Sequence, residues 1–361
     1  MSDTARPHPI HRVGFDLSPL ALAASPGVRR AALELWRALG SRAATRDGLC
    51  FVPLGARRDD HPTVWRQWTL PGTVRRLGLD GVHTTVSALP LRARVPLVQT
   101  VHEVPWRTRS NADADSNENT DRRHRYWART RRARATVVPS ERTAAALRAE
   151  RGANAPGIEV VPWGVGAPFT TVALAPRPTQ PPYFLVVGGT RPKKRLDRAL
   201  AALARCEAAR RHELVVTGAL DDAARAYVER CLSGARDFGS AARLRPVGHV
   251  DDRALAELMA GADATLGVSD SEGFGLGALE SAATGTPSVV AANSAEAEAA
   301  GPDALCFDPA LADLAGAIAA ALDRAVELAP NARADLARAA RARTWDRAAE
   351  RVAAIWCTLL R

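Results

Sequence analysis

The sequence predicts an α/β protein with two doubly wound, Rossmann-like domains that face each other across a cleft. Short apolar runs rich in β-branched residues alternate with Ala-, Leu- and Arg-rich stretches of helical periodicity, as is typical of parallel sheets covered by helices. The alternation occurs in two series, which a proline-rich stretch at 166–183 separates. The chain has 361 residues, of which 47% are hydrophobic, so it is long enough to build a core in each domain.

Each series contains six candidate strands. In the first series they lie at 12–16, 48–54, 81–86, 96–102, 135–140 and 158–165, and in the second at 183–189, 212–218, 244–250, 264–270, 287–292 and 304–308. We place the domain boundary in the proline-rich stretch, which gives an N-terminal domain at 1–170 and a C-terminal domain at 171–344, with a last helix at 345–361 that packs back on the first domain. Because open α/β sheets bind ligands at the carboxyl ends of their strands, the loops that follow the strands are expected to form the site.

Neither a membrane span nor a disulfide framework is indicated. No run of about 18 apolar residues is present, and the first residues lack the apolar middle of a signal peptide, so the cytoplasm is the expected location. The cysteines lie far apart without CxxC spacing, which predicts buried free thiols. They are Cys50, Cys206, Cys231, Cys306 and Cys357.

The formal net charge of +10 is concentrated in the first half of the chain, where residues 1–170 hold 26 arginines against 15 acidic residues. Seven of these arginines lie at 122–135, which we expect to form one amphipathic helix, and the polar stretch at 110–121 is expected to be a mobile loop. Nucleic acid is a poor partner for the arginines, because no nucleic-acid motif accompanies them and few aromatic residues interleave with them. A solvated helix face, an anionic membrane surface or a phosphate-bearing acceptor fits them better.

A glycine-rich loop at 269–290, SDSEGFGLGALESAATGTPSVV, follows a strand of the second series and leads into a helix. Glycines let the backbone approach a ligand closely, and the start of a helix offers unpaired N–H groups, here those of 273–277, that suit a phosphate. Glu272 lies just before the helix and Glu280 about two turns into it. Carboxylates beside a phosphate site can accept hydrogen bonds from sugar and ribose hydroxyls; in the alternative interpretation, Glu272 is a helix-entry carboxylate and Glu280 is solvated.

The same loop matches the dinucleotide fingerprint G-x-G-x-x-A, but the remaining features of a nicotinamide enzyme are missing. The next strand ends in Asn293, where an acidic residue for the ribose is expected. The match also lies late in the second series, whereas the fingerprint of a dinucleotide-binding domain lies in its first strand–helix unit. An oxidoreductase is therefore disfavoured.

The only two lysines of the chain, Lys193 and Lys194, stand side by side in the segment GGTRPKKRLDRAL at 188–200. All other Lys and Arg positions are arginine. An ammonium is a compact point charge for phosphate oxygens, whereas a guanidinium demands a particular geometry. The two positions therefore indicate a site that needs an ammonium; in the alternative interpretation, they are two exposed lysines on a loop.

These segments resemble the retaining nucleotide-sugar glycosyltransferases of the GT-B architecture, in the group numbered 4. Glu272 and Glu280 fall on the two glutamates of that family's E-x7-E region, and Lys194 falls on the lysine of its phosphate-binding segment. Further stretches are similar to family segments in the same order, so that the resemblance covers nearly the whole chain. They lie at 13–30, 83–91, 100–106, 137–143, 160–165 and 248–263.

The resemblance implies that a sugar moves from a nucleoside diphosphate sugar with retention, and that a donor phosphate oxygen deprotonates the acceptor. It implies that His102, Lys194 and Glu272 are catalytic: Lys194 stabilises the departing diphosphate, and Glu272 and His102 contact the sugar. The donor-binding residues that it implies are Gly188, Gly189, Arg191, Lys193, Lys194, Val250, Glu272, Gly273, Phe274, Gly275, Leu276 and, on the ribose, Glu280. Gly27, Arg29 and Glu103 are expected on the acceptor side, with the loop at 107–124.

No cofactor is expected, because the nucleoside diphosphate sugar is a co-substrate. No metal is expected either, because Lys194 and the helix start can supply the positive charge. Asp113 and Asp115 match a D-x-D metal motif but follow no apolar strand, so we assign them no metal.

The chain departs from the family's pattern at several positions. Gly189 stands where many members have arginine, Glu103 follows His102 in place of aspartate, and Trp163 and Gly166 replace a frequent asparagine and aspartate. The resemblance favours GDP-mannose or a deoxysugar donor, and a glycan, lipid-linked or small-molecule acceptor, with possible peripheral contact to the inner face of the cell membrane. A noncatalytic nucleotide-sugar-binding scaffold and a nucleotide-sugar epimerase stay open as alternatives.

Overall fold

The structure is a computed structural model, and it describes residues 10–41, 48–104, 106, 118–152, 155, 157–174, 181–207, 210–235 and 243–361. The chain divides into two compact units. Of the described residues, unit 1 takes those within 10–104, 118–164 and 344–361, and unit 2 takes Trp106 and those within 165–343. The last helix of the chain therefore belongs with the first unit.

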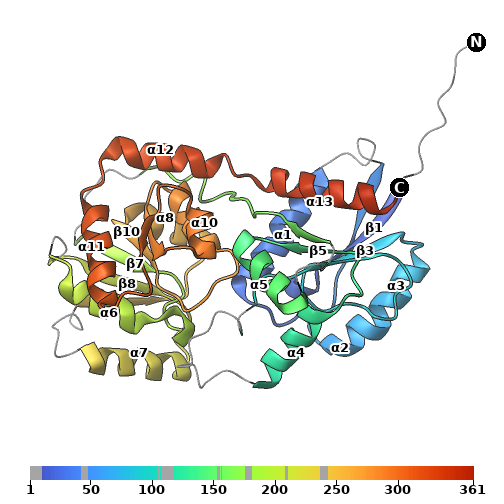
Figure 1. Cartoon of the computed structure of the whole chain (residues 1–361), viewed down its shortest axis with the longest axis horizontal. Coiled ribbons are helices and arrows are strands. Elements are labelled where there is room, and N and C mark those ends of the chain that lie inside the picture. Colours follow the sequence, from blue (N-terminus) through green and yellow to red (C-terminus); the bar gives the residue numbers. More distant parts are fainter. Residues whose placement is uncertain are drawn as a thin grey trace, which may run out of the picture. The chain divides into compact units, whose positions relative to one another are not determined.

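Unit 1 is a parallel sheet with helices on its faces (Figure 1). The strand order is β2-β1-β3-β4-β5-β6. The strands are β1 (His11–Asp16), β2 (Leu49–Leu54), β3 (Gly81–Thr84), β4 (Leu97–Thr100), β5 (Ala135–Val138) and β6 (Ile158–Val160). The helices are α1 (Pro26–Ser41), α2 (Pro62–Val64), α3 (Leu70–Arg76), α4 (Glu118–Arg129), α5 (Glu141–Arg151) and α13 (Trp345–Leu359), and the turns Ser18–Leu20 and Trp65–Thr69 are also helical.

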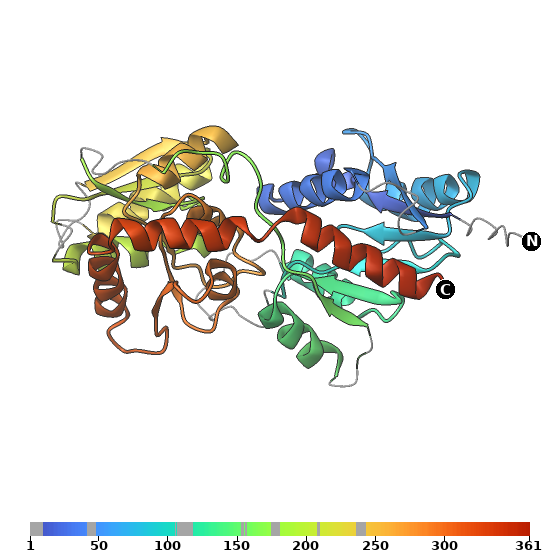
Figure 2. The ribbon, with the colours of Figure 1, turned by 90° about the horizontal axis from the view of Figure 1, so that it is seen from above.

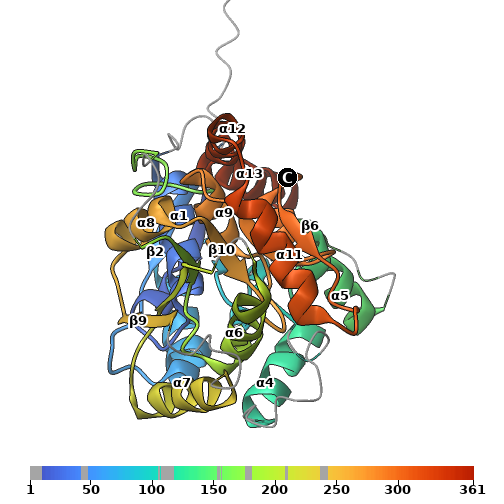
Figure 3. The ribbon, with the colours of Figure 1, turned by 90° about the vertical axis from the view of Figure 1, so that its left-hand side faces the viewer.

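Unit 2 has a second parallel sheet, in the order β12-β11-β10-β7-β8-β9. Its strands are β7 (Tyr183–Val186), β8 (Glu213–Thr217), β9 (Leu244–Gly248), β10 (Ala264–Gly267), β11 (Ser288–Ala291) and β12 (Leu305–Phe307). Its helices are α6 (Leu196–Arg205), α7 (Asp222–Ala235), α8 (Asp252–Gly261), α9 (Leu276–Ala283), α10 (Ala295–Ala300), α11 (Leu314–Val326) and α12 (Pro330–Arg341). Helices α6, α7 and α11 share one hydrophobic core with the strands, and α8 and α9 lie on the other face (Figure 3).

The two-sheet α/β fold and all twelve expected strands are confirmed. Several strands end earlier than their apolar runs do. The run at 158–165 pairs only as far as Val160, although Val161, Trp163 and Val165 beyond it are buried. A buried loop at the end of a strand carries the same apolar residues as the strand itself, so composition does not mark where the pairing stops.

The expected helix at 122–135 was too long. Helix α4 ends at Arg129, and β5 begins at Ala135 as a fully buried strand paired with β4. Between them, Arg131 donates from Nη2 to the carbonyl oxygen of Arg151 at 3.0 Å. The need to bury Ala135–Val138 in the sheet outweighs the helical tendency of the arginine run.

The expectation of buried thiols holds for Cys206 and Cys231 but is wrong for Cys306, which is exposed. Cys306 is the middle residue of the edge strand β12, and successive side chains of a strand point to opposite faces. No helix among the described residues is long and apolar enough to cross a membrane.

Helix α13, the last helix of the chain, packs against α1 in unit 1 (Figure 2). Its Trp356 is fully buried. Its ring lies directly over Gly81 at the start of β3, so closely that a Cβ at this position would collide with it. The Trp356 Nε1 also donates to Nδ1 of the buried His83 at 3.4 Å. The glycine is therefore required by the close approach of a helix to the sheet.

We expect Gly81→Ala to lower the free energy of unfolding by about 1–3 kcal/mol, because the added methyl group overpacks the contact with Trp356. Gly72→Ala is the matched control: nothing lies within 4 Å of its Cβ position, and Gly72 is inside helix α3. The control should raise stability by up to about 1 kcal/mol. Denaturant unfolding of both variants measures the difference, and equal stabilities would contradict the packing described here.

Candidate functional site

The centre of the candidate site is an ion pair at the carboxyl ends of two adjacent strands of unit 2, β7 and β10. Lys194 closes a short 3₁₀ turn, Pro192–Lys194, in the loop after β7, and Glu272 lies in the loop after β10. The Lys194 Nζ is 2.8 Å from Glu272 Oε1, and the side chains are 18% and 17% exposed. The structure thus brings together the two unit 2 residues that the sequence predicted as catalytic.

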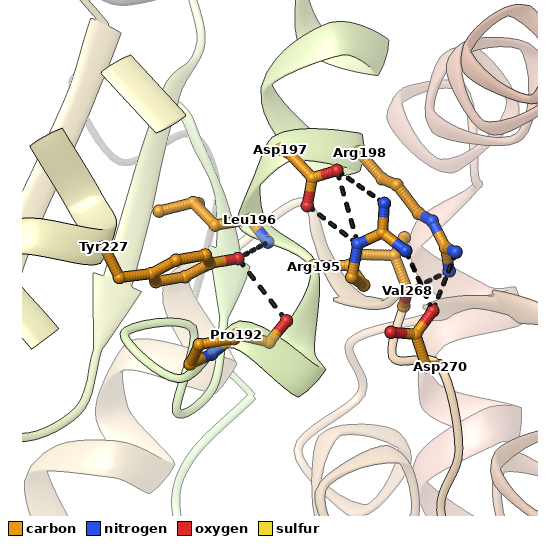
Figure 4. A network of polar contacts seen from close by, with 8 residues as sticks. All are labelled: Pro192, Arg195, Leu196, Asp197, Arg198, Tyr227, Val268 and Asp270. Carbon is orange, nitrogen blue, oxygen red and sulfur yellow. Dashed lines mark hydrogen bonds and ion pairs between the residues drawn. The ribbon is translucent and has the colours of Figure 1, made fainter. Parts of the chain in front are cut away.

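A second ion-pair cluster fixes the lysine loop to the β10 loop (Figure 4). Asp270 Oδ1 accepts from Arg195 Nη1 at 3.0 Å and pairs with Arg198 Nη2 at 2.7 Å. Arg198 Nη1 also donates to the carbonyl oxygen of Val268 at 3.2 Å. The Asp270 N–H donates to the carbonyl oxygen of Lys193 at 3.1 Å, so side chains and backbone tie the two loops together.

The lysine turn is held from its other side by Tyr227 of α7, also drawn in Figure 4. The Tyr227 hydroxyl accepts from the Leu196 N–H at 3.0 Å and donates to the Pro192 carbonyl oxygen at 3.5 Å. Arg195, between turn and helix, has a φ of 51°, a left-handed conformation that is uncommon outside glycine. Its guanidinium also binds Asp197 through Nε and Nη2. The turn that carries Lys194 is therefore held in place before any ligand arrives.

The charges of the pair reinforce one another. Burial would lower the pKa of Lys194, but the carboxylates of Glu272 and Glu296 raise it above its usual value. Burial would raise the pKa of Glu272, but Lys194 and Lys193 lower it to about 2. Both partners of the ion pair are thus charged at neutral pH.

A third carboxyl group of the site, that of Glu296, was missed by the sequence analysis. Glu296 is the second residue of α10, and it is 7% exposed. A Cβ on Gly267 would lie 2.6 Å from its Oε1, and a Cβ on Gly275 would lie 2.8 Å from its Cγ. Burial, together with the charge of Glu272, raises the pKa of Glu296 to about 7.

The turn after β7 brings Gly188 and Gly189 against the lysine loop. Gly188 has a φ of 67°, and its N–H donates to Thr217 Oγ1 at 3.2 Å. A Cβ on Gly188 would lie 3.3 Å from Arg191 Nη2 and 3.8 Å from Lys194 Cε, so both cationic side chains pass close to this glycine. A Cβ on Gly189 would clash with the side chains of Val186 and Val216 beneath the turn, so the packing requires a glycine at this position.

Helix α9 begins at Leu276, directly after Gly275, whose φ of 91° requires glycine. Gly275, the residue before the helix, makes no side-chain cap. The start of a helix carries unpaired N–H groups that suit an anion, and the binding of a phosphate by the N–H groups of 273–277 stays a prediction. Phe274 is buried under the guanidinium of Arg343, at 5.8 Å from the ring centroid. Gly273 is buried beside it.

The position of Glu280 differs from the expectation in one way and excludes one alternative. It is the fifth residue of α9, so it lies little more than one turn into the helix and not two turns. It is also 3% exposed, which excludes the interpretation that it is a solvated residue. The helix begins later than the glycine pattern suggested, because Gly275 takes the left-handed conformation that precedes it.

Val250 follows β9, the strand at the far edge of the sheet from β12. It lines an open cavity of about 660 Å³ together with Pro168, His249 and Asp252. Asp251 caps α8 there by accepting from the Ala254 N–H at 2.8 Å. The role of Val250 in binding the donor stays a prediction.

The remaining predicted residues belong to unit 1. His102 follows β4, and its Nε2 donates to the Thr85 carbonyl oxygen at 2.8 Å; burial lowers its pKa, so the ring is neutral. Glu103 is next to it, half-buried. Gly27 and Arg29 are exposed in the first turn of α1, and Arg29 Nη2 donates to the Leu20 carbonyl oxygen at 3.0 Å.

A buried pair that the sequence analysis did not single out, Asp16 and Arg66, also lies in unit 1. Asp16 ends β1, is fully buried and accepts from the Ser18 N–H at 2.8 Å. Arg66 Nη2 is 3.8 Å from Asp16 Oδ2 and donates to Ser18 Oγ at 3.1 Å. The sequence alone could not have identified this pair, because an aspartate at the end of a strand is a common pattern.

The expectations for a metal concern residues that the structure does not describe. Asp113 and Asp115, and 107–117 of the expected acceptor loop, lie outside the described residues. Within the described ranges, no group of three or more His, Cys, Asp and Glu side chains could hold a metal ion.

Two family models match the chain in succession. The model described as Glycosyltransferase Family 4 matches residues 21–167, and the model described as Glycosyl transferases group 1 matches residues 174–343. A GDP-mannose-dependent alpha-(1-6)-phosphatidylinositol dimannoside mannosyltransferase of Mycobacterium tuberculosis is 41% identical over 109 residues. That match spans 29% of this chain and only 26% of the mycobacterial protein.

Solved structures share the fold over nearly the whole chain. Sucrose-phosphate synthase from Thermosynechococcus elongatus has a TM-score of 0.75 at 16% identity, and the match covers 97% of this chain and 99% of that one. HepE of Anabaena, in complex with UDP and glucose, has a TM-score of 0.69 at 16% identity, covering 97% and 100%. At these identities the likeness establishes the two-sheet fold.

We expect Glu296→Gln to stabilise the protein above neutral pH. Because the pKa of Glu296 is higher in the folded protein than in the unfolded chain, folding stability falls as pH rises from about 4.5 to about 7 and then stays low. Glutamine cannot ionise, so the variant should gain about 1–3 kcal/mol over the wild type at about pH 8 and much less at about pH 4.5.

Thermal unfolding at both pH values measures this difference. Glu298→Gln, an exposed change on the same helix, is the control and should show no such pH-dependent gain. A gain for Glu296→Gln that is the same at both pH values would contradict the raised pKa.

Proposed function

Since the chain belongs to glycosyltransferase family 4, with the GT-B architecture, we propose that it is a hexosyltransferase that moves a sugar from a nucleoside diphosphate sugar to an acceptor. We propose further that the transfer retains the anomeric configuration and needs no metal. The observation that carries this proposal is the ion pair of Lys194 and Glu272, fixed beside the uncapped start of α9.

The chemistry follows from where negative charge develops. When the bond between the sugar and the diphosphate breaks, the departing diphosphate gains negative charge. A positive group held next to it stabilises the transition state more than the ground state, and it does so best when it needs no reorganisation. The lysine turn is held by Tyr227 and by the Asp270 cluster, so Lys194 meets that condition.

Glu272 has a double role in this proposal. It keeps Lys194 charged and oriented while the site is empty. With a donor bound, an ammonium has three donor hydrogens, so Lys194 can contact the diphosphate without leaving the carboxylate. The remaining acceptor capacity of Glu272 suits a sugar hydroxyl, and that of the buried Glu280 suits the ribose.

The donor that we favour is GDP-mannose or a deoxysugar nucleotide. The mycobacterial relative is named for GDP-mannose, and its matching segment is far more similar in sequence than the solved structures are. HepE, which was solved with UDP and with UDP-glucose, makes a uridine nucleotide the first competitor to test. No protein base is assigned, because an oxygen of the departing diphosphate can accept the acceptor's proton.

For the acceptor we propose an anionic or lipid-linked glycan that meets unit 1, with His102, Glu103, Gly27 and Arg29 on its side. Unit 1 also presents features of a peripheral membrane surface. Trp68 is 59% exposed, and the guanidinium of Arg92 lies 3.2 Å from its ring centroid. Val64 is exposed on the preceding turn, as are Arg75 and Arg76 at the end of α3 and Tyr126 on α4.

We expect Lys194→Met to lower kcat/KM by about 10²–10³, the usual effect of removing one group that stabilises a developing charge. Lys194→Met leaves the Glu272 carboxylate without its partner, which by itself can lower stability. The double variant Lys194→Met/Glu272→Gln removes that unpaired charge and should be as inactive as the single variant. Arg338→Met, a change at a 76% exposed cation, is the matched control and should turn over normally. Transfer at the wild-type rate by the folded Lys194→Met variant would refute the proposed role of Lys194.

We expect the chain to sediment with phosphatidylcholine vesicles only when they contain phosphatidylserine. The double variant Arg75→Gln/Arg76→Gln should weaken this binding by about 1 kcal/mol per arginine, because each loses its attraction to the anionic surface. Trp68→Ala should weaken it further at high salt, where apolar insertion matters more. Arg338→Gln is the control and should bind the vesicles as the wild type does. If Arg338→Gln loses as much binding as Arg75→Gln/Arg76→Gln, or if the wild type does not bind the vesicles, the assignment of the surface is contradicted.

A further inference from the structure

The carboxyl group of Glu296 has no partner that explains its burial. Helix α10 packs on α9 and β11, and the Glu296 side chain runs from the Gly275 position to the Gly267 position. Its carboxyl group lies directly over the last residue of β10, the strand whose loop carries Glu272. No described residue forms a hydrogen bond or ion pair with it.

Two glycines make room for this side chain. A Cβ on Gly267 would press on the carboxyl group of Glu296 itself, and a Cβ on Gly275 would press on the backbone and stem of Glu296. Gly275 is also required by its left-handed backbone, but Gly267 has an ordinary strand conformation, so only the approach of Glu296 calls for a glycine there. The position of the carboxyl group is therefore built into the end of the strand.

The charge of Glu296 decides the net charge that an incoming diphosphate meets. The charged groups that act on Glu296 are Glu272, Lys194 and Lys193. With Glu296 neutral, Lys194 stays paired with the single carboxylate of Glu272. With Glu296 ionised, a second carboxylate attracts Lys194 and competes with phosphate oxygens for its charge.

We propose that Glu296 is a positioning residue that takes up one proton when a nucleoside diphosphate sugar binds, and so leaves the charge of Lys194 to the diphosphate. The proton comes from solvent, resides on a Glu296 carboxyl oxygen while the donor is bound, and returns to solvent when the nucleotide departs. This inference rests on the proposed function, because it requires a diphosphate beside Lys194.

The surroundings of Glu296 suit such a protonation. Burial and the neighbouring Glu272 both favour the neutral form, and its pKa of about 7 means that a modest added negative charge is enough to complete protonation near neutral pH. Two other carboxylates belong to the packed elements: Glu280 of α9 is buried, and Glu298 of α10 is exposed. Arg343, the cation beside α10, donates to the Glu298 and Ala299 carbonyl oxygens and stabilises the helix end.

Calorimetric titration with GDP-mannose and with UDP-glucose tests the proposal. The diphosphate of both probes is esterified at each end, so it does not itself titrate near neutral pH. For the probe that binds, the dissociation constant of the wild type should rise about tenfold between about pH 6 and pH 8, with uptake of close to one proton at pH 8. Titrations in two buffers of different ionisation enthalpy measure that uptake.

Glu296→Gln should bind the probe at about pH 6 as the wild type does, with less than about a twofold change at pH 8 and no proton uptake. If Glu296→Gln does not fold, Glu296→Ala replaces it, because alanine removes the carboxyl group and adds no polar group. Its dissociation constant should likewise be independent of pH. Glu298→Gln should keep the full pH dependence of the wild type.

Three results would overturn the proposal. If Glu296→Gln or Glu296→Ala shows the wild-type pH dependence, another group takes up the proton. If Glu296→Gln weakens binding equally at both pH values, Glu296 has a structural or direct-contact role. If neither probe binds the wild type at any pH, the proposed function itself fails, and this inference fails with it.

Discussion

The ion pair between Lys194 and Glu272 is the interaction on which the rest of unit 2's site depends. Half-buried ion pairs are poor sources of stability, because the cost of removing two charges from water offsets their attraction. The chain nevertheless surrounds this pair with tethers: the Asp270 cluster on one side, the hydroxyl of Tyr227 on the other, and a left-handed Arg195 between turn and helix. Such an arrangement is understandable if its purpose is to hold a cation where a ligand's charge will appear.

The glycines of the site have distinct physical purposes. Gly188 and Gly275 take backbone conformations that other residues adopt only with strain. Gly189 and Gly267 are ordinary in conformation but have no space for a Cβ. The glycine pattern that resembles a dinucleotide fingerprint therefore serves a different end: it admits the side chain of Glu296 and exposes the start of α9.

The fold and the central pair could be predicted from the sequence because both follow from the order of strands. The carboxyl ends of parallel strands meet at one edge of a sheet, so the loops after β7 and β10 had to be close once both were recognised as strands. Glu296 could not be found in this way. It lies on a helix beyond the next strand, and only the packing of α10 on α9 brings it back to β10.

The other errors have similar causes. Where a helix starts or stops depends on contacts that composition does not contain: α4 ends where β5 must be buried, and α9 starts one residue after a left-handed glycine. The burial of Glu280 and the exposure of Cys306 depend on which face of an element meets the core. Residue type alone predicted a buried Cys306 and, for Glu280, supplied the alternative of a solvated side chain.

The most direct test of the account is a crystal structure with the nucleoside diphosphate that binds. The account predicts that Lys194 Nζ lies within hydrogen-bond distance, about 2.7–3.2 Å, of a diphosphate oxygen, with Glu272 still within reach of the same ammonium and the start of α9 facing the phosphates. A nucleotide bound with its diphosphate away from β7 and β10, and Lys194 still paired only with Glu272, would contradict it.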